Sequence, residues 1–395
     1  ARGMTRVEVE NWLEELQALH ERIAPHVRRS EPRERSLAYL KGLLSGVERR
    51  NGWQLAEQAG EDRPDGMQRL LATADWDAEL VQEDLRDYVV ETLGSEKAVL
   101  VVDETGFLKK GKKSVGVKRQ YSGTAGGVEN AQVGVFLAYA TALGTAFVDR
   151  ALFLPEEWAK DAERRQEARV PEEVRFRTKP QLALQMFKTA FKAGVKATWV
   201  TADSVYSSSE IRRYLENRKQ PFVLGISAGF MLRFPEDERI RQARVDELFG
   251  ELKAKSWQRL SAGQGSKGER FFEWAWLRLS DLSKGARSTS KSANTKKFDK
   301  WILARRSIQD PNDCAHYIVF APSTTTLQQV IQVAGTRWVI ETGFEAVKNE
   351  AGLDEYEVRS WVAWYRHITL SLLAYAFLVA IRTRELQKGG PSSVT

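Results

Sequence analysis

Three carboxylates supply the clearest chemistry in this sequence. Asp103 ends the apolar run AVLVVD, Asp203 ends the apolar run ATWVTAD, and Glu341 lies in the helical pattern RWVIETGFEAVKNE. Two aspartates at strand ends and one helical glutamate offer the hard oxygen ligands that divalent cations prefer. Two such ions can activate one oxygen and stabilise the leaving oxygen of an in-line phosphoryl displacement. These acids are therefore our candidate catalytic and metal-binding residues for an enzyme that acts on nucleic acid.

Cations cluster next to the first of these acids. After Glu104 no acid occurs before residue 120, and six cations fall in this segment: Lys109, Lys110, Lys112, Lys113, Lys118 and Arg119. An acid directly before a positively charged segment fits a metal site beside a phosphate backbone. The six cations are therefore predicted to bind DNA. An exposed basic hairpin beside an ordinary strand-end aspartate would give the same pattern.

The third acid lies between two cations on one helix face. Arg337, Glu341 and Lys348 fall on the same side of a helix by their spacing. The carboxylate could hold a metal ion while Arg337 and Lys348 grip DNA phosphates. A stripe of intrahelical salt bridges is the structural alternative.

A second basic segment, LSKGARSTSKSANTKKFDK, interrupts a β-rich region. It is low in apolar residues, so we expect a long loop. Lys296 and Lys297 within it are predicted to contact DNA. Trp301 follows, and an aromatic ring there could stack on an unpaired base. Core packing is the alternative for Trp301 and for most of the twelve tryptophans.

Changes of hydrophobic period divide the chain into segments. We expect a helical DNA-binding domain (1–93), the first part of an α/β catalytic domain (94–229), a β-rich insertion (230–325), the C-terminal helices of the catalytic domain (326–385) and a flexible tail (386–395). Four helices are expected in the first segment. They carry Arg28, Arg29, Arg33, Arg35, Arg49 and Arg50. These arginines either bind DNA or form a solvated face of a helical bundle.

The catalytic segment reads as β-β-β-(β)-α-β-α-β. Because crossovers between parallel strands are right-handed, we expect the strand ending at Asp203 to lie parallel to, and beside, the strand ending at Asp103. Both aspartates would then emerge at the carboxyl edge, where open α/β sheets place their sites.

Composition excludes several other classes. The net charge of +7 suits an anionic partner, and the single Cys314 excludes a disulfide framework and a cysteine zinc cluster. The most apolar stretch, residues 368–381, is too short to span a bilayer and is predicted to be a buried helix. No secretory signal pattern opens the sequence. We therefore expect a cytoplasmic protein with no membrane partner.

Several motifs carry a family resemblance. The spacing Arg337-x3-Glu341-x6-Lys348 resembles part of the signature of IS4-type DDE transposases. The segments DETGFLKKGKKSVGVKRQYSGTAGGVENAQVGVF, FRTKPQLALQMF and WVTADSVYSSSEIRRYLE resemble the IS701 branch of that superfamily. One departure is visible, because the signature's tyrosine would fall at Ala334.

This resemblance, covering about residues 35–365, implies an RNase H-like mixed sheet with flanking helices and cut-and-paste transposition. It also implies two Mg²⁺ ions held by Asp103, Asp203 and Glu341, with Mn²⁺ as a substitute. The partners would be double-stranded DNA, both transposon ends and target, and a second copy of the chain in a homodimer on DNA. A bacterial, nucleoid-associated location is expected. An RNase H-like nuclease without strand transfer and a domesticated, transposase-derived DNA-binding protein remain the alternatives.

Overall fold

The computed structural model describes residues 6–123, 125–236, 239–265, 268–282 and 297–388. They form a mixed α/β protein with a large mixed sheet and a set of N-terminal helices. The chain divides into two compact units. Unit 1 contains Ala1–Gly94, Glu104–Val195 and Glu341–Thr395, and unit 2 contains Ser95–Asp103 and Lys196–Ile340. The domain bounds expected from the sequence follow functional modules and stay a prediction. Most of the expected tail, residues 389–395, lies outside the described residues.

The N-terminal part of unit 1 is helical, as expected. Its helices are α1 (Arg6–Ile23), α2 (Ser30–Leu43), α3 (Gly52–Gln58), α4 (Asp65–Ala72) and α5 (Ala78–Leu93). The sequence predicted four helices; the additional short one is α3. Asn51 begins α3 by accepting hydrogen bonds from the backbone N–H groups of Trp53 and Gln54, the interaction that an N-cap provides. Such a one-residue signal is easily overlooked beside the longer periodic segments.

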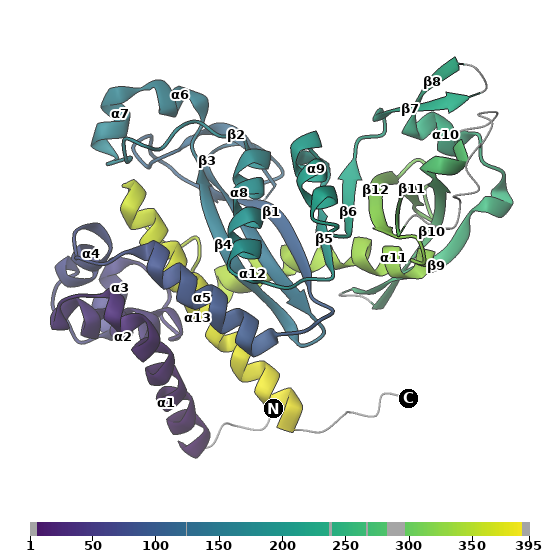
Figure 1. Ribbon diagram of the computed structural model, residues 1–395. Helices are drawn as coiled ribbons and strands as arrows, with labels where there is room; N and C mark the ends of the chain where they lie inside the picture. Colours follow the sequence, from purple (N-terminus) through teal and green to yellow (C-terminus); the bar gives the residue numbers. More distant parts are fainter. Residues whose placement is uncertain (1–5, 124, 237–238, 266–267, 283–296, 389–395) are drawn as a thin grey trace. The chain divides into compact units, whose positions relative to one another are not determined.

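Helix α13 (Trp361–Lys388) forms the core of unit 1. By length and composition it is the one described helix that could cross a membrane, but 89% of its most apolar window is buried inside the protein. It packs against α2, α4, α5 and the strand β4 (Gly144–Phe153), and Figure 1 shows α5 and α13 side by side. The expectation of a buried apolar helix is confirmed, with longer bounds than 368–381.

The sheet of unit 1 is built on β3 (Gly127–Thr141). It pairs antiparallel with β2 (Lys118–Ser122) and with β4, and its other neighbour is β1 (Val99–Leu108). Further helices of this unit are α6 (Glu156–Lys160), α7 (Ala162–Glu167), α8 (Lys179–Lys192) and most of α12 (Trp338–Ala351). Helix α8 packs on β3 and β4 and begins at a capping box of Thr178 and Gln181.

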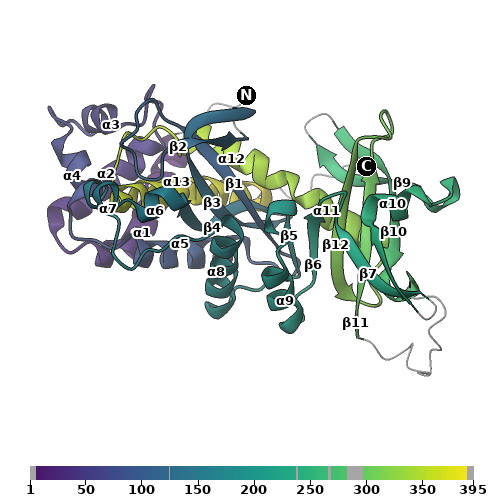
Figure 2. The same cartoon turned by 90° about the horizontal axis from the view of Figure 1, so that it is seen from above.

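In unit 2, the first half of β1 pairs in parallel with β5 (Trp199–Ala202), and β5 pairs in parallel with β6 (Phe222–Ile226). Antiparallel strands extend this sheet in the order β12 (Cys314–Pro322), β11 (Phe298–Arg306), β10 (Gly268–Arg278) and β9 (Gln258–Gly265), which Figure 2 shows together. A separate hairpin consists of β7 (Met231–Glu236) and β8 (Arg239–Arg244). The helices of this unit are α9 (Ser209–Asn217), α10 (Val245–Gly250) and α11 (Leu327–Thr336).

The parallel pairing of the two aspartate-bearing strands is confirmed, but Asp103 does not end its strand. Strand β1 continues to Leu108 because its second half has a different neighbour, β3. Residues 104–108 look less strand-like in sequence because polar Glu104 and Thr105 follow the apolar run. Phe107 is nonetheless buried, with only 1% of its surface exposed.

Candidate active site

Asp103 and Asp203 follow the last matched positions of two neighbouring parallel strands. The register pairs Val99 with Trp199 and ends with Val102 opposite Ala202. Asp103 is the next residue of β1, and Asp203 directly follows the end of β5. Because parallel strands advance in step, the two aspartates leave the shared ladder at the same edge of unit 2, as the sequence predicted.

The conformation of Asp203 is fixed by a turn and by a neighbouring glycine. Its Oδ1 accepts a hydrogen bond from the Val205 backbone N–H at 2.8 Å, which begins a short 3₁₀ turn, Ser204–Tyr206. Gly225 of β6 lies directly against this backbone. A Cβ at that position would lie 2.9 Å from the Ser204 nitrogen and 3.0 Å from the Asp203 carbonyl carbon. The close approach therefore requires glycine.

Asp103 faces a cation. The Arg337 guanidinium lies 3.4 Å from Oδ2 of Asp103, whose side chain is only 14% exposed. The next residue, Glu104, points to the opposite face of the strand. There, in unit 1, its carboxylate pairs with Lys179 at 2.7 Å, at the start of α8. Cations thus compensate the carboxylates on both faces of β1.

Glu341 is an exposed residue in the first turn of α12. Further along this helix, Lys348 donates a hydrogen bond from Nζ to the Gly106 carbonyl of β1 at 3.3 Å, within unit 1. Burial lowers the pKa of the Lys348 ammonium. Asp103, Asp203 and Arg337 belong to unit 2, whereas Glu341 and Lys348 belong to unit 1.

The donor set fits divalent cations. Asp103 and Asp203 present carboxylate oxygens, the hard ligands of Mg²⁺, and Asp103 already interacts with a positive group at Oδ2. Within the ranges that the structure describes, no group of three or more His, Cys, Asp or Glu side chains is assembled for a metal ion. Of the three expected ligands, Asp103 and Asp203 lie together in unit 2, whereas Glu341 belongs to unit 1.

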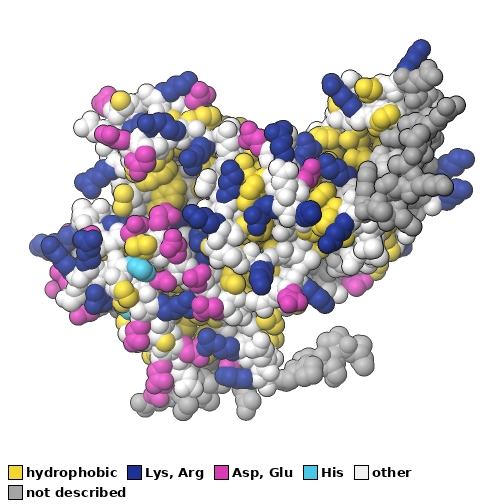
Figure 3. All heavy atoms as spheres, viewed as in Figure 1, with side chains coloured by type: hydrophobic (Ala, Val, Ile, Leu, Met, Phe, Trp, Pro, Cys, Tyr) yellow, Lys and Arg dark blue, Asp and Glu magenta, His cyan; other side chains and the backbone are white. Residues whose placement is uncertain are grey.

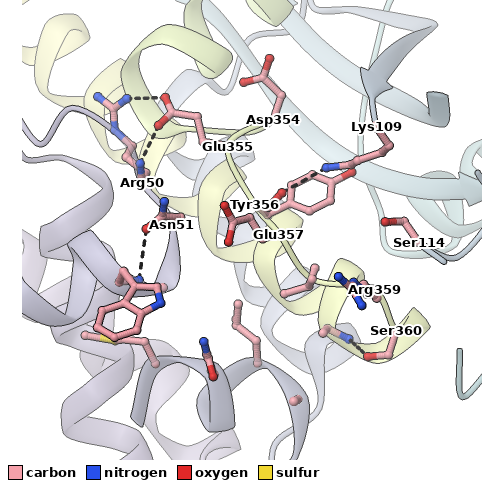
Figure 4. Close-up of a pocket in the computed structure, with 18 of the residues that line it drawn as sticks. Arg50, Asn51, Lys109, Ser114, Asp354, Glu355, Tyr356, Glu357, Arg359 and Ser360 are labelled. Carbon is pink, nitrogen blue, oxygen red and sulfur yellow. Dashed lines mark hydrogen bonds and ion pairs between the residues drawn. The ribbon is translucent and has the colours of Figure 1, made fainter. Parts of the chain in front are cut away.

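Lys109 is not a free surface cation. Its Nζ donates a hydrogen bond to the Tyr356 carbonyl at 3.1 Å and lies 3.6 Å from the centroid of the Tyr356 ring. Figure 4 shows this contact at the wall of a pocket. Burial lowers the pKa of Lys109 to about 8, although Asp354 and Glu357 act in the opposite direction. Its first role is therefore to attach the basic segment to the loop around Tyr356.

The other predicted cations of this segment differ in their surroundings. Lys110 and Lys112 are exposed. Lys113 pairs with Glu167, and Lys118 pairs with Glu157 at 2.9 Å. Arg119 reaches the Val128 carbonyl at 3.5 Å. The exposed lysines are therefore the best placed of these residues to meet a phosphate backbone.

The strands of residues 258–322 support the packing alternative for Trp301. Trp301 is 3% exposed and stacks on Trp276, with ring centroids 5.5 Å apart and planes 10° apart. Arg278 lies 5.3 Å above the Trp301 ring. Lys297 is exposed at the start of β11, whereas Lys296 and most of the basic loop lie outside the described residues.

Several N-terminal arginines have partners inside unit 1. Arg33 donates to the carbonyls of Ala24 and Val27, Arg35 pairs with Glu31 and Glu61, and Arg50 pairs with Glu355.

Figure 3 shows Asp and Glu side chains gathered over α5, and Lys and Arg side chains gathered over α9. The cations over α9 follow from its sequence, which holds Arg212 and Arg213.

Sequence reasoning missed three supporting residues. Gly225 carries no pattern of its own, and its role depends on the approach of the Asp203 backbone. Lys179 lies in the segment FRTKPQLALQMF, but its ion-pair partner Glu104 is 75 positions away in the sequence. Tyr356 holds Lys109 from 247 positions away. Only contacts in the folded chain reveal these roles.

Comparison with known proteins shows the family of this chain. The chain matches the family described as DDE superfamily endonuclease over residues 22–267, and the transposase DDE domain over residues 176–377. Both matches cover more than half of the chain, and each includes Asp203. The chain therefore belongs to the DDE transposase family, whose domain implies nuclease or transposase activity and whose members generally use divalent metals.

One similar protein is named as a transposase of the IS701 type. The chain is 26% identical over 321 residues to a probable transposase for insertion sequence element IS701 from Microchaete diplosiphon. The match covers 80% of this chain and 74% of that protein. The resemblance to the IS701 branch is thereby confirmed.

Proposed function

We propose that this protein is a cut-and-paste DNA transposase that cleaves transposon ends and joins them to target DNA in a metal-dependent reaction. The observation that carries the proposal is the register of β1 and β5, which brings Asp103 and Asp203 to one sheet edge. The membership in the DDE transposase family supports the reaction class.

In this proposal Asp103, Asp203 and Glu341 hold two Mg²⁺ ions. When bound, the metal ions supply activation of the attacking oxygen and charge stabilisation at the leaving oxygen. The chain's own residues prepare this position. Gly225 and the Val205 N–H orient Asp203, and Arg337 compensates the charge of Asp103.

The DNA contacts that we propose are of two kinds. Arg337 and Lys348 position phosphates near the carboxylates, and Lys110 and Lys112 meet the backbone farther along the DNA. Contacts of this second kind hold DNA without reading its sequence. The N-terminal helices would recognise a transposon end, and the protein would act at the nucleoid in the bacterial cytoplasm.

The strand connectivity supports an RNase H-like core. The strands β1, β2, β3 and β4 are followed by the parallel strands β5 and β6, and β1 is the neighbour of both β3 and β5. The strands β7–β12 then precede the helices α11–α13. We therefore propose that β7–β12 are an insertion within that core.

A strand-transfer assay tests the function. The protein is incubated with Mg²⁺, a labelled transposon end and a plasmid, and the products are separated by size. We expect labelled DNA joined to plasmid with the wild-type protein and none with Asp203→Asn. Cleaved but never joined ends would instead assign a nuclease, and DNA binding without cleavage would assign a binding protein.

We further propose a homodimer on DNA, because two ends must be cut and joined together. Residues 1–94 belong to the same compact unit as later segments, so truncation is a poor test. The better test mixes Asp203→Asn with a full-length variant that no longer binds ends. Recovery of cleavage supports action in trans; failure despite co-assembly on DNA indicates action in cis.

A further inference from the structure

A large pocket in unit 1 lies outside the carboxylate site. Its volume is about 1110 Å³, and its lining comes from four stretches, within residues 48–53, 67–73, 108–114 and 354–360, and from Tyr39, Glu167, Arg169 and Ala363. Figure 4 shows these segments around the pocket, with Lys109, Asp354, Glu357 and Arg359 among the labelled side chains. Small-molecule pockets usually measure about 300–1,000 Å³, so this one has room for a larger, extended ligand.

The pocket lining contains side chains that suit a nucleic-acid strand. Arg49, Lys110 and Arg359 are exposed cations in its lining. Trp53 also lines it, and 54% of this large aromatic residue is exposed. Cations beside an exposed aromatic ring are the combination by which proteins bind single strands, since the ring stacks on a base while the cations meet phosphates.

The loop of residues 354–360 also brings two acids into the pocket lining. Asp354 and Glu357 are exposed, whereas the residues between them are anchored. Glu355 pairs with Arg50 at 2.9 Å. The buried Tyr356 donates from its hydroxyl to Gln132 at 2.8 Å. The backbone that carries the two exposed carboxylates is therefore held in place.

Carboxylates in a DNA-binding pocket have an electrostatic cost, because they repel phosphates. They also have a specific use. A carboxylate accepts hydrogen bonds from the exocyclic amino group of a base such as cytosine, whereas a carbonyl oxygen at that position is repelled. A pocket lined by acids as well as by cations and an aromatic ring thus favours a base with an amino group.

We propose that this pocket binds an unpaired stretch of DNA strand and selects bases that carry an exocyclic amino group. Trp53 stacks on a base, the cations hold the phosphates, and Asp354 and Glu357 accept hydrogen bonds from the amino group. A duplex can unpair locally at a cost of a few kcal/mol. The inference rests on the proposed function only in taking DNA as the ligand. It adds a second region, separate from the carboxylate site, where the protein would distinguish between bases.

The test measures equilibrium binding of the full-length protein to labelled dC12 and dU12 oligonucleotides. These probes share a pyrimidine ring and a backbone and differ at the position of the amino group. We expect wild-type protein to bind dC12 about tenfold more tightly. Trp53→Ala should weaken binding of both probes by about tenfold, because stacking tolerates any base.

The double variant Asp354→Ala/Glu357→Ala should bind dU12 more tightly than wild type and lose most of the preference for dC12. Glu83→Ala is the matched control, since it removes an exposed acid of unit 1 outside the pocket lining. Thermal melting verifies that each variant is folded.

Three results would overturn the inference. In one result, Asp354→Ala/Glu357→Ala binds dC12 and dU12 more tightly by the same factor and keeps the preference for dC12. The two acids would then act only as ordinary surface charge. Absence of any preference in wild type, or unchanged binding by Trp53→Ala, would remove the pocket as a strand site. The strand-transfer assay reports separately on the proposed function, so a failure of either can be told from a failure of the other.

Discussion

Asp103 and Asp203 each follow directly the last register pair of two parallel strands, Val102 on β1 and Ala202 on β5. This relationship predicts the effect of removing either carboxylate. Asp103→Asn and Asp203→Asn should each lower the cleavage rate by about 10³-fold or more, because several kcal/mol of charge stabilisation would disappear. Affinity for DNA should change little. Single-turnover cleavage and a binding titration measure the two quantities, and a proportionate loss of binding would argue against a chemical role.

Gly225 predicts a separate effect on Asp203. In Gly225→Ala the new methyl group must displace the backbone at Ser204 and Asp203, at a cost of about 1–3 kcal/mol of folding free energy. A displacement near 1 Å at a reacting group can reduce the rate about 10²-fold. Gly250→Ala is the control, because nothing lies within 4 Å of its added Cβ. Denaturant unfolding and cleavage rates should both separate the two variants; equal behaviour would contradict the crowding argument.

The lysines of the basic segment should not be interchangeable. Lys110→Gln/Lys112→Gln should weaken binding to every DNA sequence alike and reduce the salt slope by about 0.9 for each phosphate that the protein no longer neutralises. Lys109→Met should instead lower stability, because it removes the interaction with Tyr356. Binding titrations at several salt concentrations, with a melting curve for each variant, measure both effects. A salt slope that stays the same in the double variant would make these lysines plain solvated surface.

His367 should make the protein sensitive to acid. Its Nδ1 receives a hydrogen bond from the Tyr39 hydroxyl, and burial lowers its pKa from 6.5 to about 4. Below pH 6.5 the unfolded chain binds a proton that the folded chain excludes. The contribution of His367 to the free energy of unfolding is therefore fully present above pH 6.5. It is lost as the pH drops toward 4, by up to ~3 kcal/mol in total.

Unfolding measurements between pH 7 and pH 4 test this expectation when wild type is compared with His367→Gln. The difference between the two proteins isolates His367 from Asp149, whose burial raises its pKa to about 6 and which acts in the opposite sense. The gap between the proteins should narrow as the pH falls. A gap that is constant with pH would show that His367 does not titrate in this range.

Sequence patterns predicted the fold where the rules are local. The apolar runs before Asp103 and Asp203, with a helix between them, were enough to place two parallel strands together. The bounds of β1 were not predictable, because Glu104 and Thr105 interrupt the apolar run and their strand conformation depends on pairing with β3. The helix α3 was missed because its signal is a single capping residue, Asn51.

The candidate site divides in a similar way. Residue type and spacing selected the candidate carboxylates, which remain a prediction, whereas the surroundings of the cations depend on distant contacts. Lys109 looked like its neighbours in sequence, yet its ammonium lies against the Tyr356 ring. Trp301 looked available for stacking, yet its ring lies against Trp276. No local pattern encodes a partner that is far away in the chain.

The burial of α13 has a consequence for synthesis. Tyr39 and His367 are in contact although 328 positions separate them. The N-terminal helices of a nascent chain therefore lack their central packing partner until α13 has left the ribosome. During that interval apolar residues such as Leu40 and Leu85, which are buried in the finished protein, have nothing to cover them. Unit 1 should thus reach its native state only after translation of α13, and chaperone binding to shorter nascent chains is expected.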